Sequence, residues 1–234
     1  MNMHNIAIIP ARGGSKGIPK KNLVDFCGKP LIAWTILQAK SAQGVDEVFV
    51  TTDNPEIAEV SKSYGAEIIT RPPELAADTS TSEAALNHAL LEIQKSHSRT
   101  IDYVVFLQAT SPLRENSDIE NALAKITEAQ ADSLFSAAEL SDFLIWSQTG
   151  GRLQSVNYNY LNRRRRQEEE RPQLAENGSI YVFKPEILLK HGNRLGGKIC
   201  YSLMELWKAF EIDDYEGLKF CEDLFRIKLL KSQT

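Results

Sequence analysis

The chain has 234 residues, which is enough for one sizeable globular domain. Hydrophobic residues account for 42% of them and charged residues for 25%, and a net charge of −4 provides no overall positive field for nucleic acids or anionic membranes. No stretch approaches the roughly 20 consecutive apolar residues that a membrane-spanning helix needs. These features exclude nucleic acid and membrane as partners.

The cysteines and the first residues predict a cytoplasmic protein. Cys27, Cys200 and Cys221 are odd in number and show no CxxC spacing, which favours reduced thiols over disulfides or a zinc site. Residues 1–10 contain no charged leader followed by a long apolar run, so we expect no signal peptide.

Short β-branched runs alternate with helical patterns in the first part of the chain. We expect strands at 5–9, 47–52, 67–70, 102–109 and 133–137. We expect helices that begin at Pro30, at Asn54-Pro55, at a capping box of Ser80 and Glu83, and at a cap formed by Ser117 with Glu120. This alternation predicts an α/β domain with a mainly parallel sheet, in which the apolar strand 102–109 is central.

The pattern changes after residue 140. Residues 142–156 ("DFLIWSQTGGRLQSV") predict a hairpin that turns at Gly150-Gly151. The chain then passes through a polar stretch and returns in strands at 178–183 and 209–213, before an amphipathic helix from Tyr215 to Leu230. We therefore expect one domain, residues 1–234, with residues 140–176 inserted as a β-hairpin dimerisation arm. Its apolar side chains should be exposed on a lone subunit: Phe143, Ile145, Leu153 and Val156.

Residues 8–22 ("IIPARGGSKGIPKKN") place four cations in one loop directly after the first strand. Arg12, Lys16, Lys20 and Lys21 repel one another unless an anion lies among them. Glycines let backbone N–H groups turn toward such an anion, and arginine and lysine both bind phosphate. The loop matches neither GxxxxGK[ST] nor GxGxxG, so we expect a triphosphate site of another kind, with a solvated basic loop as the alternative.

Residues 210–213 ("FEID") alternate apolar and acidic side chains. In the expected strand, Glu211 and Asp213 share one face while Phe210 and Ile212 point into the core. Two carboxylates beside phosphates suit Mg²⁺, which takes one or two carboxylates and keeps several waters. The alternative is a solvent-facing strand edge.

These motifs resemble those of the CMP-sugar synthetases that activate nine-carbon acidic sugars, the acylneuraminate cytidylyltransferases. Besides the loop, the similarity comprises "RPPELAADTSTS" (71–82), "LQATSPLR" (107–114), "RRQ" (165–167), "ENGSIY" (176–181) and "FEIDD" (210–214), in the same order. The resemblance implies a Rossmann-like nucleotidyltransferase fold and an obligate homodimer with shared active sites. It also implies Mg²⁺-dependent transfer of CMP from CTP to the anomeric hydroxyl of the sugar, with release of pyrophosphate.

The resemblance also implies a role for individual residues. The catalytic group is Arg12, Lys16, Lys21 and Asp213. The nucleotide-binding group is Arg12, Gly14, Ser15, Lys21, Asn22, Arg71 and Ser82, of which Arg71 and Ser82 would contact cytosine and Asn22 the ribose. The sugar-binding group is Gln108, Arg166 and Asn177, with Arg166 reaching the site of the partner subunit. The metal ligands are Asp213 and Glu211.

Two positions depart from the family pattern. Glu211 stands where relatives usually have aspartate, and Ala175 stands where several have an arginine two residues before Asn177. The second change removes a polar contact with the sugar, so legionaminate, pseudaminate or another nonulosonate is as compatible with the sequence as N-acetylneuraminate. Another sugar nucleotidyltransferase of the same fold and a non-catalytic nucleotide-sugar binding module are the alternative functions.

Overall fold

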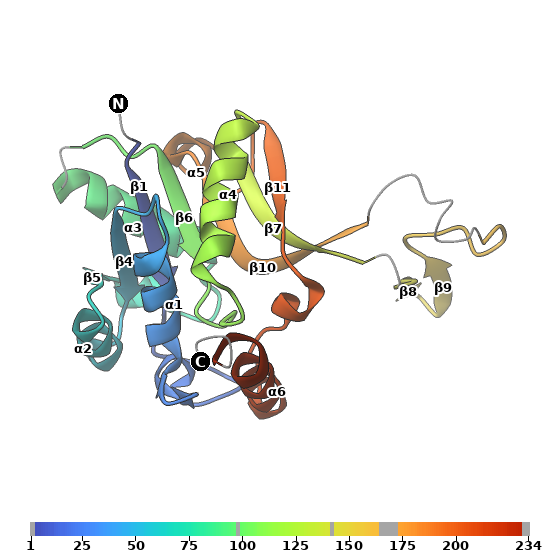
Figure 1. The fold of residues 1–234 in the computed structure, drawn as a ribbon, viewed down its shortest axis with the longest axis horizontal. Helices are drawn as coiled ribbons and strands as arrows, with labels where there is room; N and C mark the ends of the chain where they lie inside the picture. Colours follow the sequence, from blue (N-terminus) through green and yellow to red (C-terminus); the bar gives the residue numbers. More distant parts are fainter. Residues whose placement is uncertain (1–2, 97–98, 141–142, 164–172, 231–234) are drawn as a thin grey trace.

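A seven-stranded sheet forms the centre of the computed structural model, which describes residues 3–96, 99–140, 143–163 and 173–230 (Figure 1). The strand order is β11-β7-β10-β6-β1-β4-β5. The strands are β1 (Asn5–Pro10), β4 (Glu47–Thr52), β5 (Glu67–Thr70), β6 (Tyr103–Leu107), β7 (Ser133–Glu139), β10 (Leu174–Phe183) and β11 (Ile199–Leu203).

Most of these strands run parallel to their neighbours. β1 pairs in parallel with β4 and β6, β4 with β5, and β7 with β11. Only β10 is antiparallel to both strands beside it. The prediction of a mainly parallel sheet with β6 at its centre is confirmed.

Helices cover both faces of the sheet. α1 (Leu31–Ser41), α2 (Pro55–Ser63) and α4 (Asn116–Glu128) pack on one face, and α3 (Ser82–Ser96) and α5 (Pro185–His191) on the other. α6 (Tyr215–Phe225), continued by a π-helical turn at Arg226–Leu230, packs against Leu31 and Phe26. None of the helices described here is long and apolar enough to cross a membrane. The short elements are β2 (Asp25–Phe26), β3 (Lys29–Pro30) and the 3-10 turns Lys21–Leu23, Pro73–Leu75 and Leu206–Ala209.

The predicted caps of α3 and α4 are wrong by one or two residues. α3 begins at Ser82, and the Thr81 hydroxyl accepts a hydrogen bond from the Ala84 N–H, whereas the Ser80 hydroxyl donates to the Glu74 carbonyl. In α4 the capping box is formed by Glu115 with Asp118. A cap belongs to the residue before the first helical one, so Ser117, which is already helical, cannot fill that position.

The predicted strand at 209–213 is also wrong. Residues Leu206–Ala209 form a 3-10 turn, and the following segment pairs with no strand; its Ile212 N–H donates to the Thr110 carbonyl at 2.9 Å. Ile212 is buried as expected, but Phe210 is 44% exposed and packs on Phe220. The edge strand β11 and the helix α5 are elements that the sequence patterns did not reveal.

The predicted hairpin is present. β8 (Trp146–Thr149) and β9 (Arg152–Ser155) pair antiparallel, with Gly150 and Gly151 at positive φ in the turn. The hairpin forms its own two-stranded sheet and extends away from the main sheet, at the right of Figure 1. Its apolar side chains are exposed, by 41% at Ile145 and by 67% at Leu153.

Candidate active site

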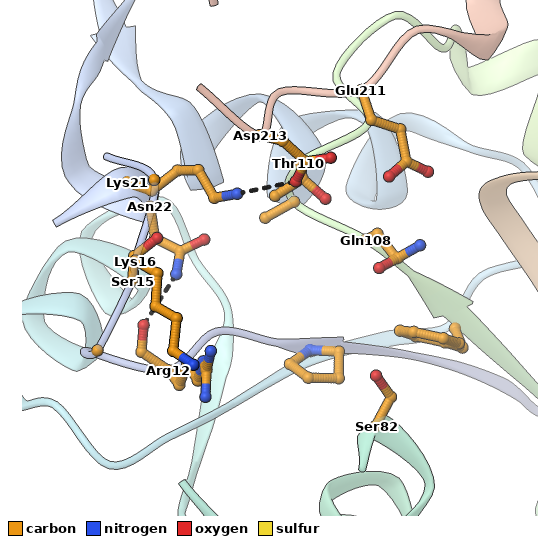
Figure 2. A pocket seen from close by; sticks show the side chains of 15 residues that line it. Arg12, Ser15, Lys16, Lys21, Asn22, Ser82, Gln108, Thr110, Glu211 and Asp213 are labelled. Atoms are coloured by element: carbon orange, nitrogen blue, oxygen red, sulfur yellow. Dashed lines mark hydrogen bonds and ion pairs between the residues drawn. The ribbon is translucent and has the colours of Figure 1, made fainter. Parts of the chain in front are cut away.

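A polar cavity of about 380 Å³ opens at the carboxyl ends of β1 and β6. Figure 2 shows the loop after β1 at the left of it, Asp213 and Glu211 at the top, and Gln108 at the right below Glu211. Carboxyl ends of neighbouring parallel strands are the usual ligand site of an open α/β sheet. The cavity brings together most of the predicted site residues: Arg12, Gly14, Ser15, Lys16, Lys21, Asn22, Ser82, Gln108, Glu211 and Asp213.

Lys21 joins the loop to the carboxylate segment. Its ammonium donates to the Ile212 carbonyl at 2.8 Å and lies 3.4 Å from the Asp213 carboxylate. The Lys21 side chain is only 14% exposed. The neighbouring Lys20 adopts left-handed backbone angles, which turn its side chain outward to Glu56 at 2.6 Å. One residue of the pair thus faces the cavity and the other faces solvent.

Hydrogen bonds from within the protein hold the loop in place. The Asn22 amide is buried and donates to the Arg12 carbonyl at 3.0 Å, and the Gly13 N–H donates to Asp53 at 2.9 Å. At Gly17 an added Cβ would lie 1.9 Å from the Asp213 carbonyl oxygen. Because only glycine allows so close an approach, Gly17 lets the loop lie directly against the carboxylate segment.

The two carboxylates differ in their surroundings. Glu211 is half-buried, and burial, with the charge of Asp213 as a smaller cause, raises its pKa above the ordinary value. Its Oε1 accepts a hydrogen bond from the Ser111 hydroxyl at 3.3 Å and lies where a Cβ at Gly178 would fall. The Asp213 side chain is 84% exposed. The pair supplies hard oxygen ligands that fit a hydrated divalent cation, although the described residues contain no cluster of three or more candidate ligands.

The sugar-binding predictions fall at different places in the structure. Gln108 follows β6, lines the cavity and donates to the Gly178 carbonyl at 2.8 Å. Asn177 does not line it; its side chain is buried, accepts from Ser136 and Ser179, and is engaged within the protein. Arg166 lies outside the described residues.

A second cavity of about 270 Å³ adjoins the first, with Pro10, Arg12 and Ser82 lining both. Arg71 lies in its wall rather than in the first cavity. The Arg71 guanidinium is buried, donates to the Thr51 carbonyl at 2.6 Å, and has a pKa lowered chiefly by burial. The site therefore has two connected compartments, one basic and one bounded by Arg71.

Two site residues escaped the sequence analysis. Asp78 contacts both Arg12 and Lys16, whereas the sequence analysis assigned roles in its segment only to Arg71, Ser80 and Ser82. Arg114 is fully buried, and burial lowers its pKa to about 9. It donates to the carbonyls of Gln108 and Ser111 and so fixes the turn that follows β6. The sequence signal for Arg114 is a charged side chain directly after the apolar pair Pro112-Leu113.

These features place the molecule among the α/β nucleotidyltransferases, whose chemistry needs a phosphate-binding loop opposite acidic groups at the ends of the strands. More narrowly, the chain belongs to the cytidylyltransferase family, whose model matches residues 6–186.

Similar proteins come from animals and bacteria. The chain is 37% identical over 214 residues to N-acylneuraminate cytidylyltransferase A of Danio rerio, covering 90% of this chain and 48% of that protein. It is 43% identical over 138 residues to pseudaminic acid cytidylyltransferase of Campylobacter jejuni, covering 58% of this chain and 59% of that one. The chain thus spans about half the length of these relatives.

The fold is that of solved cytidylyltransferase-like structures. CMP:2-keto-3-deoxy-manno-octonic acid synthetase complexed with CTP superimposes with a TM-score of 0.73 at 19% identity, covering 97% of this chain and all of that one. At this identity the likeness concerns the fold alone.

Glu211→Gln should stabilise the metal-free protein. A raised pKa means that the folded state holds a proton on Glu211 more tightly than the unfolded state does, so ionised Glu211 costs stability once the pH exceeds the unfolded value. We expect the melting temperature at neutral pH without divalent cations to rise by about 1–4 °C. Between pH 4 and pH 8, the melting temperature of the variant should also decline less with rising pH than that of the wild type. A lower melting temperature in the variant would contradict this account of Glu211.

Proposed function

We propose that the protein transfers CMP from CTP to the anomeric hydroxyl of a nine-carbon acidic sugar and releases pyrophosphate. The observation that carries the proposal is the two-compartment site, in which Arg12, Lys16 and Lys21 line one cavity together with Glu211 and Asp213. The second compartment, bounded by Arg71 and Ser82, has room for a pyrimidine base next to the first. Family membership supports cytosine as that base.

The chain's own residues act by positioning and charge. Arg12, Lys16 and Lys21 would hold the triphosphate and stabilise the charge that develops on pyrophosphate as it leaves. Gln108 would orient the sugar so that its anomeric hydroxyl attacks the α-phosphate in line. No protein nucleophile is required.

Mg²⁺ would be held by Asp213 and Glu211, the two carboxylates in the cavity. When bound, the ion supplies charge neutralisation at the α-phosphate and favours loss of the hydroxyl proton.

We also propose a cytoplasmic location, in keeping with the three free cysteines.

A pyrophosphate-release assay tests the proposal. CTP, UTP, ATP and GTP should each be offered with N-acetylneuraminate, legionaminate and pseudaminate in the presence of Mg²⁺. We expect release only with CTP and strongest with one of the three acids. Release with another nucleotide would favour a different sugar nucleotidyltransferase, and binding without release would favour a non-catalytic module. The retention of Lys16, Lys21 and Asp213 in the cavity speaks against the second alternative.

We further propose a homodimer in which each arm reaches the other subunit. The exposed apolar side chains of the hairpin, such as Leu153 and Val156, form a surface of the kind that marks an interface. A two-fold axis would cover both arms at once. The segment that follows the hairpin carries Arg166, whose guanidinium suits the carboxylate of the sugar acid.

Arg166→Ala should raise KM for the sugar acid far more than KM for CTP. Loss of one charge-assisted hydrogen bond costs about 1.5–3 kcal/mol, or roughly 10- to 150-fold in affinity. Steady-state kinetics with each substrate varied in turn measures the split. Mixing this variant with one inactivated at Lys21 should restore activity, because one site of a shared dimer would carry neither defect. Absence of recovery after demonstrated subunit exchange would mean that the arm does not serve the neighbouring site.

A further inference from the structure

The anion that lies among the loop cations in this structure is a carboxylate of the protein itself. Asp78 approaches Arg12 at 2.9 Å through Oδ1 and Lys16 at 3.1 Å through Oδ2, so each oxygen serves one cation. The Arg12 guanidinium also donates to the neighbouring Ala77 carbonyl at 3.3 Å. The hydrogen bond from Lys16 is the main reason that the pKa of Asp78 lies below its ordinary value.

The ion pairs of Asp78 with Arg12 and Lys16 connect the two compartments of the site. Asp78 lines the Arg71 compartment, whereas Lys16 lines the basic one, and Arg12 lines both. A nucleotide that fills both compartments must bring its phosphates to the two cations that Asp78 now holds. Arg12 and Lys16 cannot bind the Asp78 carboxylate and a phosphate with the same donors. A phosphate bound to these two cations would also repel the Asp78 carboxylate beside it.

We propose that Asp78 is a positioning residue that acts as an exchangeable counter-anion: it holds Arg12 and Lys16 in place until polyphosphate binds, gives them up to the nucleotide, and takes them back as pyrophosphate leaves. The inference rests on the proposed function for the identity of the polyphosphate. Asp78 suits this exchange because its side chain is 52% exposed and that of Lys16 is 76% exposed, so the ion pairs are weak and quickly broken.

Asp78→Asn should therefore bind polyphosphate more tightly than the wild type. The amide is nearly isosteric but no longer competes for the cations, and relief from two exposed ion pairs corresponds to a dissociation constant about three- to tenfold lower. Isothermal titration calorimetry with inorganic pyrophosphate, and separately with CTP, measures the change. A merely structural role for Asp78 predicts the opposite, because a loosened loop would bind both ligands more weakly.

Glu56→Gln is the matched control. It removes a carboxylate that pairs with Lys20 of the same loop at 2.6 Å but does not line the cavity. Its affinity for pyrophosphate should equal that of the wild type. If both variants bound pyrophosphate equally more tightly, the cause would be a general charge effect, and the specific role of Asp78 would be overturned. Unchanged or weaker binding by Asp78→Asn would overturn it too.

A second readout follows the carboxyl group itself. In ¹³C NMR titrations, the Asp78 carboxyl should titrate below the ordinary aspartate range in the free protein and move back toward it when pyrophosphate is bound. An unchanged titration would mean that the carboxylate is not displaced. The calorimetry with pyrophosphate and the NMR titration need no CTP, so their results stand even if the assay with CTP shows no turnover. Absence of turnover would count against the proposed function only.

Discussion

Lys21→Met should lower kcat by about 10²- to 10³-fold, which is the usual effect of removing one preorganised donor from a charge-stabilising site. Methionine keeps the aliphatic stem that is buried between the loop and the carboxylate segment but removes the ammonium. That ammonium is the only group linking the loop to both Ile212 and Asp213 among the hydrogen bonds of the described residues. Steady-state kinetics with CTP and the best sugar acid measures the loss.

The same substitution should also lower the melting temperature. The Ile212 carbonyl loses its hydrogen bond from Lys21, at a cost of about 1 kcal/mol, which corresponds to about 2–4 °C for a chain of this size. Lys20→Met is the matched control, because Lys20 is the adjacent residue and its side chain pairs with Glu56 outside the cavity. We expect normal kcat in the control. A Lys21→Met enzyme that retains more than about a third of wild-type kcat would show that this loop is not the triphosphate site.

The first strand and the loop after it illustrate what the sequence alone can reveal. The short, β-branched run "NIAII" is typical of a buried strand, and cations with glycines directly after it indicate an anion site at the carboxyl end of a sheet. Local patterns of this kind need no knowledge of the rest of the fold. The hairpin at Gly150-Gly151 was predictable for the same reason, because two glycines between alternating runs specify a tight turn.

Features that depend on distant contacts were not predictable. The alternation in "FEID" resembles a strand, but the Ile212 N–H donates to the carbonyl of Thr110, about a hundred residues earlier in the chain. Asn177 belongs to a polar motif, yet the folded chain directs its amide to Ser136 instead of the cavity. The pairing of Asp78 with Arg12 likewise depends on how the loop after β5 folds back over the loop after β1. Periodicity describes neighbours along the chain, and it contains no information about such contacts.

Asp213→Asn should lower kcat by about a thousandfold at saturating CTP. A metal ion at the reacting phosphate contributes several kcal/mol of charge stabilisation, and the asparagine amide would bind that ion poorly. Asp213 is the more exposed of the two cavity carboxylates, whereas burial opposes charge on Glu211. We therefore expect Glu211→Gln to retain more activity than Asp213→Asn and to need a higher Mg²⁺ concentration for half-maximal rate.

Asp214→Asn is the control for this last prediction. Asp214 is the neighbouring residue, but its carboxylate caps α6 by accepting from the Gly217 N–H at 2.8 Å, a role that asparagine fills equally well. This variant should keep wild-type kcat, Mg²⁺ dependence and melting temperature. Activity measured across a Mg²⁺ titration separates the three variants, because only loss of a metal ligand shifts the half-maximal concentration. If Asp213→Asn falls within threefold of the wild type in both kcat and Mg²⁺ requirement, the residue does not hold the metal, and the acidic side of the cavity must serve the sugar instead.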